Sequence, residues 1–144
     1  MNQFKEFERK TEGFSTPLQG MLDCIKFNEQ GLIPAIAQQF DSKEVLMMAW
    51  MNIDALKETL ETGRVCYWSR SRGGLWRKGE SSGQVQVLKS LALDCDGDTV
   101  LMQVDQTGPA CHTGRRHCFF YSVEGENVKI TGEVLISPDD LYRK

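Results

Sequence analysis

The sequence predicts a single domain of the α+β class, mostly β-structure with one or two helices. The chain has 144 residues, of which 40% are hydrophobic, and this size and composition suit one hydrophobic core. Most of its apolar segments are short, β-prone runs separated by glycine-containing stretches. One segment, residues 52–62, has the apolar spacing of an amphipathic helix.

The first half of the chain predicts an extension, two strands and this helix. Residues 1–20 are charged and weakly periodic, so we treat them as an extension of uncertain structure before a domain at 21–144. Residues 20–31 are ambiguous, and residues 32–40 predict an early strand. The continuous apolar run 45–51 favours a buried strand by its length, although a helix also fits. In the helix at 52–62, Asn52 or Asp54 can cap the first turn, Leu56 and Leu60 share a face, and Gly63 ends it.

The second half predicts mainly strands. Residues 65–69, 85–93, 99–104 and 118–123 are all β-prone. Within 85–93, Val85 and Val87 alternate with polar neighbours, and Leu91 and Leu93 continue this pattern less regularly, as is typical of a strand. Residues 138–142 predict a last helical turn.

Composition excludes several functional classes. The net charge of −3 indicates no general affinity for nucleic acid or membranes. No apolar stretch approaches the ~18 residues of a membrane span, and residues 1–10 lack the apolar core of a secretory signal, so we expect a cytoplasmic protein. Five cysteines in a reducing compartment argue against disulfides. Buried thiols, a nucleophile and metal ligands remain as alternatives.

An acidic segment, Asp94-Cys95-Asp96-Gly97-Asp98, places three carboxylates at alternate positions. If the segment is extended, the three carboxylates share one face and Cys95 lies on the other. Hard oxygen ligands suit Mg²⁺ or Ca²⁺, whereas a thiolate suits a softer metal. A solvated acidic turn between two strands is the alternative interpretation.

Both histidines of the chain lie in a cysteine-containing cluster at residues 108–118. Cys111, His112, His117 and Cys118 belong to it, and Cys95 is upstream by a strand and a turn. Three thiolates and a water form a plausible open zinc site. The spacing matches neither a zinc ribbon nor the nucleobase deaminases. A cysteine–histidine nucleophile is a weaker alternative, because adjacent residues on a strand face apart.

A basic, acid-free segment runs from residue 64 to residue 78. Arginine forks and serine hydroxyls bind phosphate well, and glycines allow close approach of a ligand. For Trp68 and Trp76 we favour positions in the core. The candidate phosphate-binding residues are Ser69, Arg70, Ser71, Arg72, Arg77 and Lys78.

Together these motifs resemble the phosphoribosyl-AMP cyclohydrolase family of histidine biosynthesis. The resemblance covers residues 25–121 and is carried by five motifs in order: Tyr67-Trp68-Ser69-Arg70-Ser71-Arg72, Leu75-Trp76-Arg77-Lys78-Gly79-Glu80, Ser82-Gly83, Asp94-Cys95-Asp96-Gly97-Asp98, and Gly108-Pro109-Ala110-Cys111-His112-Thr113-Gly114 with Cys118-Phe119. It implies a compact pseudo-barrel with an inserted helix, assembled as a homodimer.

The resemblance also implies two metal sites. Cys95, Cys111 and Cys118 match zinc ligands, with the cysteine at position 95 coming from the partner subunit. Asp94, Asp96 and Asp98 match Mg²⁺ ligands.

The implied reaction is hydrolytic ring opening of the N1-alkylated adenine of phosphoribosyl-AMP by a zinc-activated water. His112 is our candidate for the residue that carries the proton, because an unperturbed histidine pKa of ~6.5 suits this role. The partners expected are therefore a small nucleotide substrate and a second copy of the chain. The alternative function is a non-catalytic, zinc-stabilised module that binds RNA or a phosphorylated ligand.

Overall fold

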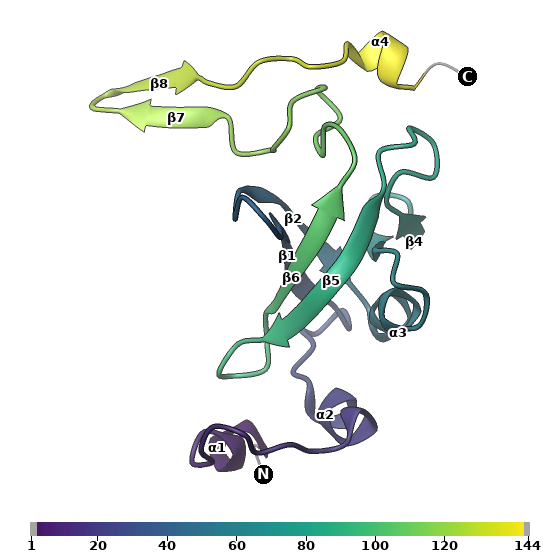
Figure 1. The fold of residues 1–144 in the computed structure, drawn as a ribbon, viewed down its shortest axis with the longest axis vertical. Helices are drawn as coiled ribbons and strands as arrows, with labels where there is room; N and C mark the ends of the chain where they lie inside the picture. Colours follow the sequence, from purple (N-terminus) through teal and green to yellow (C-terminus); the bar gives the residue numbers. More distant parts are fainter. Residues whose placement is uncertain (1–2, 143–144) are drawn as a thin grey trace.

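The computed structural model describes residues 3–142, which form eight strands and four helices (Figure 1). The predicted class, mostly β with few helices, is confirmed. In chain order the elements are α1 (Gln3–Phe7), α2 (Leu18–Cys24), β1 (Ile33–Gln39), β2 (Val45–Met51), α3 (Ile53–Thr62), β3 (Cys66–Ser69), β4 (Gly74–Arg77), β5 (Gln86–Leu93), β6 (Val100–Gln106), β7 (Tyr121–Glu124), β8 (Asn127–Ile130) and α4 (Pro138–Leu141). None of the helices in the described range is long and apolar enough to cross a bilayer.

Six strands form one curled sheet in the order β4-β3-β2-β1-β6-β5. All neighbouring strands are antiparallel except β1 and β6, which run parallel. The sheet curls until β5 contacts the segment that leads into β3: Leu88 N donates to Gly63 O at 2.8 Å and Val65 N to Gln86 O at 3.0 Å. The result is a half-barrel, in agreement with the pseudo-barrel expected from the resemblance.

The core lies inside this curl. β1 and β6 alternate strictly between buried and more exposed residues, as half-buried strands do. From β1, Ile33, Ala35 and Ala37 face inward, and from β6, Val100 and Met102 do so. Ala35 and Ala37 are small and completely buried, which leaves room inside the curl for larger core side chains such as Met51.

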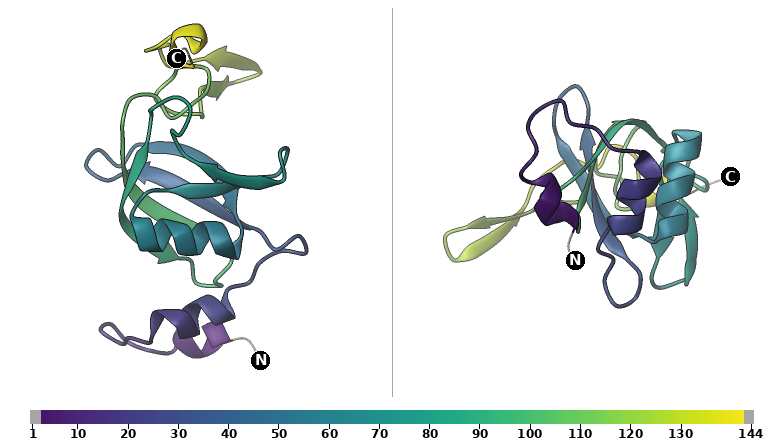
Figure 2. Two further views of the ribbon diagram at one scale, coloured as in Figure 1. Left: turned by 90° about the vertical axis from the view of Figure 1, so that its right-hand side faces the viewer. Right: turned by 90° about the horizontal axis from the view of Figure 1, so that it is seen from below.

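Helix α3 forms where the sequence predicts it. The Asn52 side chain accepts a hydrogen bond from Ala55 N at 2.8 Å and so caps the helix, whereas Asp54 is exposed in the first turn. Gly63 ends the helix in the left-handed conformation, at φ 73°, that glycine adopts without strain. The helix connects β2 to β3 and lies against the sheet (Figure 2), and its Leu56 is completely buried.

Strand β5 forms where the sequence predicts a strand, but its alternation is interrupted. Val87 points outward and is 37% exposed, while its neighbours Gln86 and Leu88 face the interior. The register shifts between Leu88 and Ser90, so Leu91 then returns to the inner face. A bulge inserts one extra residue, so the residues that face inward before it and after it follow different phases of the alternation. A two-residue repeat in the sequence does not show where such a bulge lies.

Further differences from the sequence analysis lie in short elements. The predicted strand at 118–123 begins only at Tyr121, and β4 and β8 are the return strands of two hairpins. Residues 3–24 hold α1 and α2; these segments are too short to show clear periodicity. The domain boundary at residue 20 stays a prediction.

Candidate functional site

A turn-rich segment, residues 107–120, follows β6 at one end of the sheet (Figure 1). Backbone hydrogen bonds fold it on itself, with Ala110 N donating to Arg116 O and Cys111 N to Arg115 O. Cys118 N donates to Leu46 O at 2.8 Å and ties the segment to β2. The fold thus brings both ends of the predicted cysteine cluster together.

Cys111 and Cys118 form a thiol pair. The two side chains are close enough to hydrogen-bond, and the Thr113 hydroxyl donates to Cys111 Sγ at 3.1 Å. Burial, and then the neighbouring Cys111 thiol, raise the pKa of Cys118 to about 12. Two thiolates at this position therefore need a compensating cation.

Lys78 points at this pair. Its ammonium group donates to the carbonyl of Ala110, the residue before Cys111, at 2.6 Å and lies 5.5 Å from the centre of the Trp76 ring. Burial lowers the pKa of Lys78, and the nearby Cys118 and Cys111 groups act in the opposite direction. This candidate phosphate ligand is therefore already engaged with the cysteine segment.

A buried polar network, which the sequence analysis missed, lies behind the thiols. The Tyr67 hydroxyl donates to Gln86 Oε1 at 2.7 Å, and Gln86 Nε2 donates to Gln106 Oε1 at 2.8 Å. Burial raises the pKa of Tyr67 and the Cys118 group adds to the effect, so the phenol stays neutral. The sequence signal that could have predicted this network is glutamine at inward-facing positions of strands, such as Gln39 and Gln106.

The two histidines differ in environment. His112 is exposed beside the thiol pair. His117 is half-buried: its Nδ1 accepts a hydrogen bond from Phe119 N at 3.2 Å, and its Nε2 lies 3.8 Å from Glu44 Oε2. Of the two, His112 has the more accessible imidazole.

The acidic segment lies at the opposite end of the sheet, beside α1 (Figure 1). It is a turn between β5 and β6, with Asp94 N donating to Thr99 O and Gly97 N to Asp94 O. Gly97 has a φ of 71°, and the ring of Phe4 occupies the space that a Cβ there would need. The acidic segment is therefore not extended, because the chain reverses direction here, and its three carboxylates are not aligned on one face.

This turn changes which side chains meet. Ligand atoms of Glu8, Cys95 and Asp96 lie within 4.8 Å of one another, so Cys95 and Asp96 do not face apart. Asp94 and Asp98 form a second pair, in which Asp98 N donates to Asp94 Oδ1 at 3.0 Å. The pKa of Asp98 is raised, first by a side-chain hydrogen bond with Asp94 and then by slight desolvation and the charges of Asp94 and Asp96. A divalent cation would relieve this repulsion, so the oxygen donors suit Mg²⁺.

Cys95 does not join Cys111 and Cys118 within one chain. Among residues 3–142 the only group of three potential metal ligands this close together is the one with Glu8, Cys95 and Asp96. The thiol pair of a single chain therefore offers two sulfur ligands where an open zinc site has three protein ligands.

The basic segment forms the hairpin β3–β4 and one wall of a groove of about 590 Å³. The Arg70 guanidinium lies over the Trp50 ring, 4.9 Å from its centre, and the hydroxyls of Ser69 and Ser71 are 3.3 Å apart. Arg72 is exposed at the same turn. The lining of the groove is Met48, Ala49, Trp50, Trp68, Ser69, Arg70, Ser71 and Trp76. Aromatic rings, hydroxyls and a guanidinium together can hold a phosphorylated base.

Arg77 points away from this groove. It forms a two-pronged ion pair with Glu58 of α3, with both N–O distances at 2.8 Å. The hydrogen bond from Arg77 lowers the pKa of Glu58 and raises that of Arg77 itself. Both tryptophans line the groove, and Trp76 also packs against the core as expected, whereas Trp68 is not among the residues packed against it.

Comparison with known proteins adds independent findings. The profile of the family described as phosphoribosyl-AMP cyclohydrolase matches residues 47–120. The chain is 60% identical over 141 residues to the phosphoribosyl-AMP cyclohydrolase of Hydrogenovibrio crunogenus, covering 98% of this chain and 96% of that protein. It is 61% identical over 141 residues to the protein of the same name from Alcanivorax borkumensis, covering 98% and 99%. With that of Halorhodospira halophila it shares 65% identity over 122 residues, covering 85% and 86%.

Proposed function

Because the chain belongs to the phosphoribosyl-AMP cyclohydrolase family, an enzyme family of histidine biosynthesis, we propose that it opens the adenine ring of phosphoribosyl-AMP with a water activated by zinc. The observation that carries the proposal is the thiol pair of buried Cys111 and half-buried Cys118, which faces the ammonium group of Lys78. Free thiols, five in the described range, suit a reducing cytoplasm.

Two chains complete the zinc site under this proposal. Cys111 and Cys118 of one subunit supply two ligands, and Cys95 of the partner subunit supplies the third. Cys95 is exposed at the far end of its own sheet, where its thiol is accessible to a second chain. Zinc, when bound, lowers the pKa of a water molecule and so makes a nucleophile available near neutral pH.

The substrate lies in the groove beside β3 and β4. Ser69, Arg70, Ser71 and Arg72 bind its phosphates, and the rings of Trp50 and Trp68 flank the base. Lys78 acts from behind the thiols instead, and Arg77 holds the hairpin to α3. Asp94 and Asp98, which already form a pair, would hold Mg²⁺ with carboxylate oxygens, and Asp96 would have to turn toward them from its position beside Glu8 and Cys95.

The reaction adds the oxygen of water to carbon 6 of the purine and breaks the bond from carbon 6 to nitrogen 1. One proton of the water has to reach nitrogen 1 as this bond breaks. His112, exposed next to Cys111, accepts the proton and donates it to the leaving nitrogen. The buried tyrosine–glutamine network stays neutral and holds the wall behind the thiols.

Ultraviolet absorbance of phosphoribosyl-AMP tests the proposal. We expect the wild-type protein to change the absorbance, and a zinc chelator or the substitution Cys111→Ser to abolish turnover. Zinc content should fall in the variant while the circular dichroism spectrum remains that of a folded protein. Full turnover by Cys111→Ser would remove cysteine ligation from the mechanism.

The same experiment separates the enzyme from a zinc-stabilised binding module. A structural zinc site would make the chelator unfold the chain, because metal binding then supplies much of the folding free energy. Under the enzyme proposal, turnover is lost at chelator concentrations that leave the fold intact.

A further inference from the structure

The hairpin β7–β8 carries an exposed apolar face. Its cross-strand pairs are Tyr121 with Ile130 and Val123 with Val128, and these four side chains are 57–75% exposed. Ser122 and Lys129 pair on the opposite face. The hairpin projects from the body of the molecule (Figures 1 and 2). A two-stranded hairpin is marginal by itself, and an apolar face of this kind in a soluble chain marks an interaction surface.

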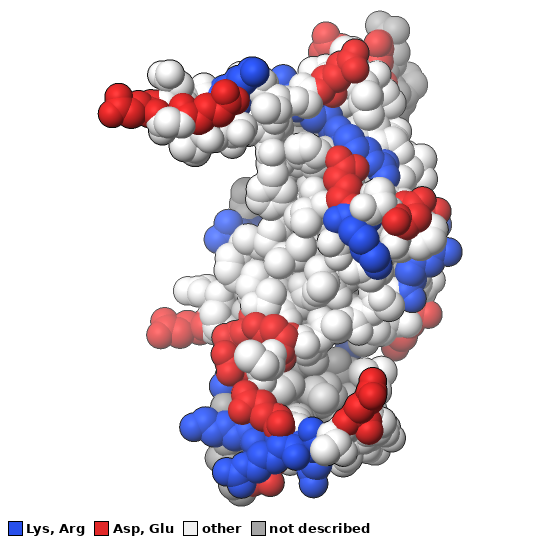
Figure 3. All heavy atoms as spheres, turned by 60° about the vertical axis from the view of Figure 1, so that its left-hand side comes forward, with Lys and Arg blue, Asp and Glu red and all other residues white. Residues whose placement is uncertain are grey.

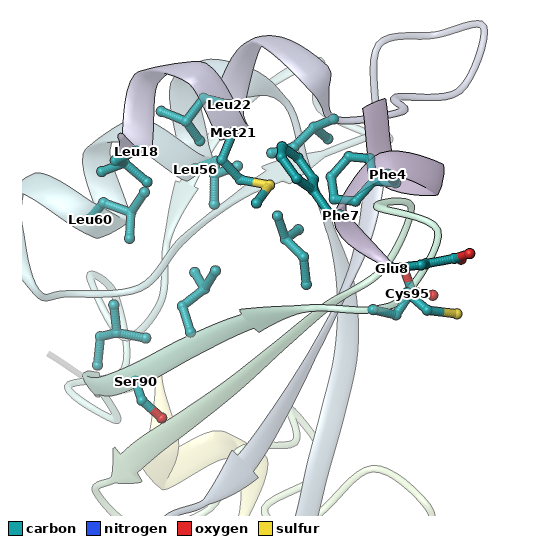
Figure 4. Close-up of a pocket in the computed structure, with 15 residues that line it drawn as sticks. Phe4, Phe7, Glu8, Leu18, Met21, Leu22, Leu56, Leu60, Ser90 and Cys95 are labelled. Atoms are coloured by element: carbon teal, nitrogen blue, oxygen red, sulfur yellow. The ribbon is translucent and has the colours of Figure 1, made fainter. Parts of the chain in front are cut away.

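A second uncovered apolar surface lies at the other end of the molecule. It is a groove of about 660 Å³ between the N-terminal helices, α3 and β5. Figure 4 shows Leu18, Met21 and Phe7 directed into this groove, with Cys95 at its edge. Leu18 is 57% exposed although it belongs to this apolar lining.

Each of these surfaces adjoins one half of the proposed zinc site. Tyr121 follows Cys118 by three residues, and Cys95 itself lines the groove. When Cys95 of the partner subunit reaches the thiol pair, it brings its own groove to the side where the hairpin begins. The shared zinc site alone therefore brings the hairpin of one subunit close to the groove of the other.

Charge is partly complementary across this contact. Glu124 and Glu126 are exposed at the tip of the hairpin. Lys5, Arg9 and Lys10 are exposed on the N-terminal segment, interleaved with acidic residues. Figure 3 shows acidic side chains at the projecting tip at one end of the molecule and basic side chains next to acidic ones at the other end. Only the basic members of this mixed segment can attract the acidic tip, so the contact depends mainly on the two apolar surfaces.

We propose that the apolar face of the β7–β8 hairpin packs into the groove beside Cys95 of the partner subunit. A two-fold dimer makes this contact twice, and each contact secures one shared metal site. The inference rests on the proposed function, which requires Cys95 of a second chain at the thiol pair.

The test compares two neighbouring substitutions on opposite faces of the hairpin. Val123→Asp places a charge on the apolar face and Ser122→Asp places it on the polar face. In an isolated chain Val123 is 75% exposed, so its substitution should do no more harm than that of half-buried Ser122. If the hairpin docks, Val123→Asp should raise the dimer dissociation constant at least about tenfold in sedimentation experiments. Ser122→Asp should leave that constant within about threefold of wild type.

Leu18→Asp tests the groove. We expect it to weaken the dimer as Val123→Asp does, and the double variant to lose less than the product of the two single effects, because one contact is removed twice. Zinc content at low protein concentration should fall together with the dimer. Multiplicative effects, or equal behaviour of Val123→Asp and Ser122→Asp, would overturn the inference. A wild-type protein that is monomeric or free of zinc would instead refute the shared site of the proposed function.

Discussion

Lys78 shows that one residue of the basic segment can have a role other than the phosphate binding predicted for the segment. The acid-free segment suggested that all its basic residues bind phosphate, yet the ammonium group of Lys78 lies on the Ala110 carbonyl and faces two thiols. Its neighbour Arg77 pairs with Glu58 on the other side of β4. Arg77 is the last residue of β4 and Lys78 begins the turn after it, and the two side chains reach different partners, so neighbouring cations acquire different roles.

We predict that Lys78→Met weakens zinc binding about 10- to 100-fold, because outer groups that support metal ligands contribute this much to affinity. Loss of the cation leaves the two thiolates less well compensated. Competition with a chromogenic chelator measures the affinity directly, independently of turnover.

Lys89→Met provides the matched control for this residue. The Lys89 ammonium group also lies on an aromatic ring, 5.2 Å from the centre of Phe40, but on the exposed side of β5. Its variant should bind zinc as the wild type does. Equal zinc affinity in both variants would show that Lys78 does not support the thiol pair.

Among the elements, α3 is the one that local signals define most completely. A cap, an i, i+4 apolar pair and a terminal glycine all lie within twelve residues, and each appears in the structure. The turn between β5 and β6 shows the opposite case. Its residues suit either an acidic turn or an extended metal-binding segment, so local signals do not decide between the two. In the structure it is a turn, and the ring of Phe4, which is distant in the sequence, packs against Gly97.

The cap of α3 gives a prediction for stability. Asn52→Ala should lower the free energy of unfolding by about 1 kcal/mol, because it removes the hydrogen bond to Ala55 N. Urea denaturation followed by circular dichroism measures the change. Asp54→Ala should cost less, about 0.3–1 kcal/mol, because Asp54 contributes only its charge near the helix start. If Asp54→Ala lowered the free energy of unfolding more than Asn52→Ala does, Asn52 would not be the residue that caps the helix.

At the scale of the whole molecule, the distribution of cysteines is the main observation. Residues 107–120 and the turn 94–99 lie at opposite ends of one sheet, because the seven-residue strand β6 separates them. One chain therefore cannot gather all three cysteines. An assembly of two chains can do so without changing the fold.

Mixing inactive variants tests this assembly. Cys95→Ser and Cys118→Ser should each be inactive alone, and equal amounts mixed under exchange conditions should recover about a quarter of wild-type activity. Half of the randomly formed dimers are then heterodimers, each with one intact site of two. A mixture that stays inactive, although mass spectrometry detects heterodimers, would contradict a shared site.

The sequence by itself determined the class of the fold, most of the strands, α3 with its cap, and the family to which the chain belongs. These features depend on periodicity, capping residues and motifs, which are local in the chain. Only the tertiary structure decided that β5 carries a bulge, that Lys78 faces the thiols, that Tyr67 and the inward glutamines form a network, and that Cys95 lies apart from Cys111 and Cys118. These features arise from contacts between residues distant in sequence, and their geometry is set by how the sheet curls and by which strands become neighbours.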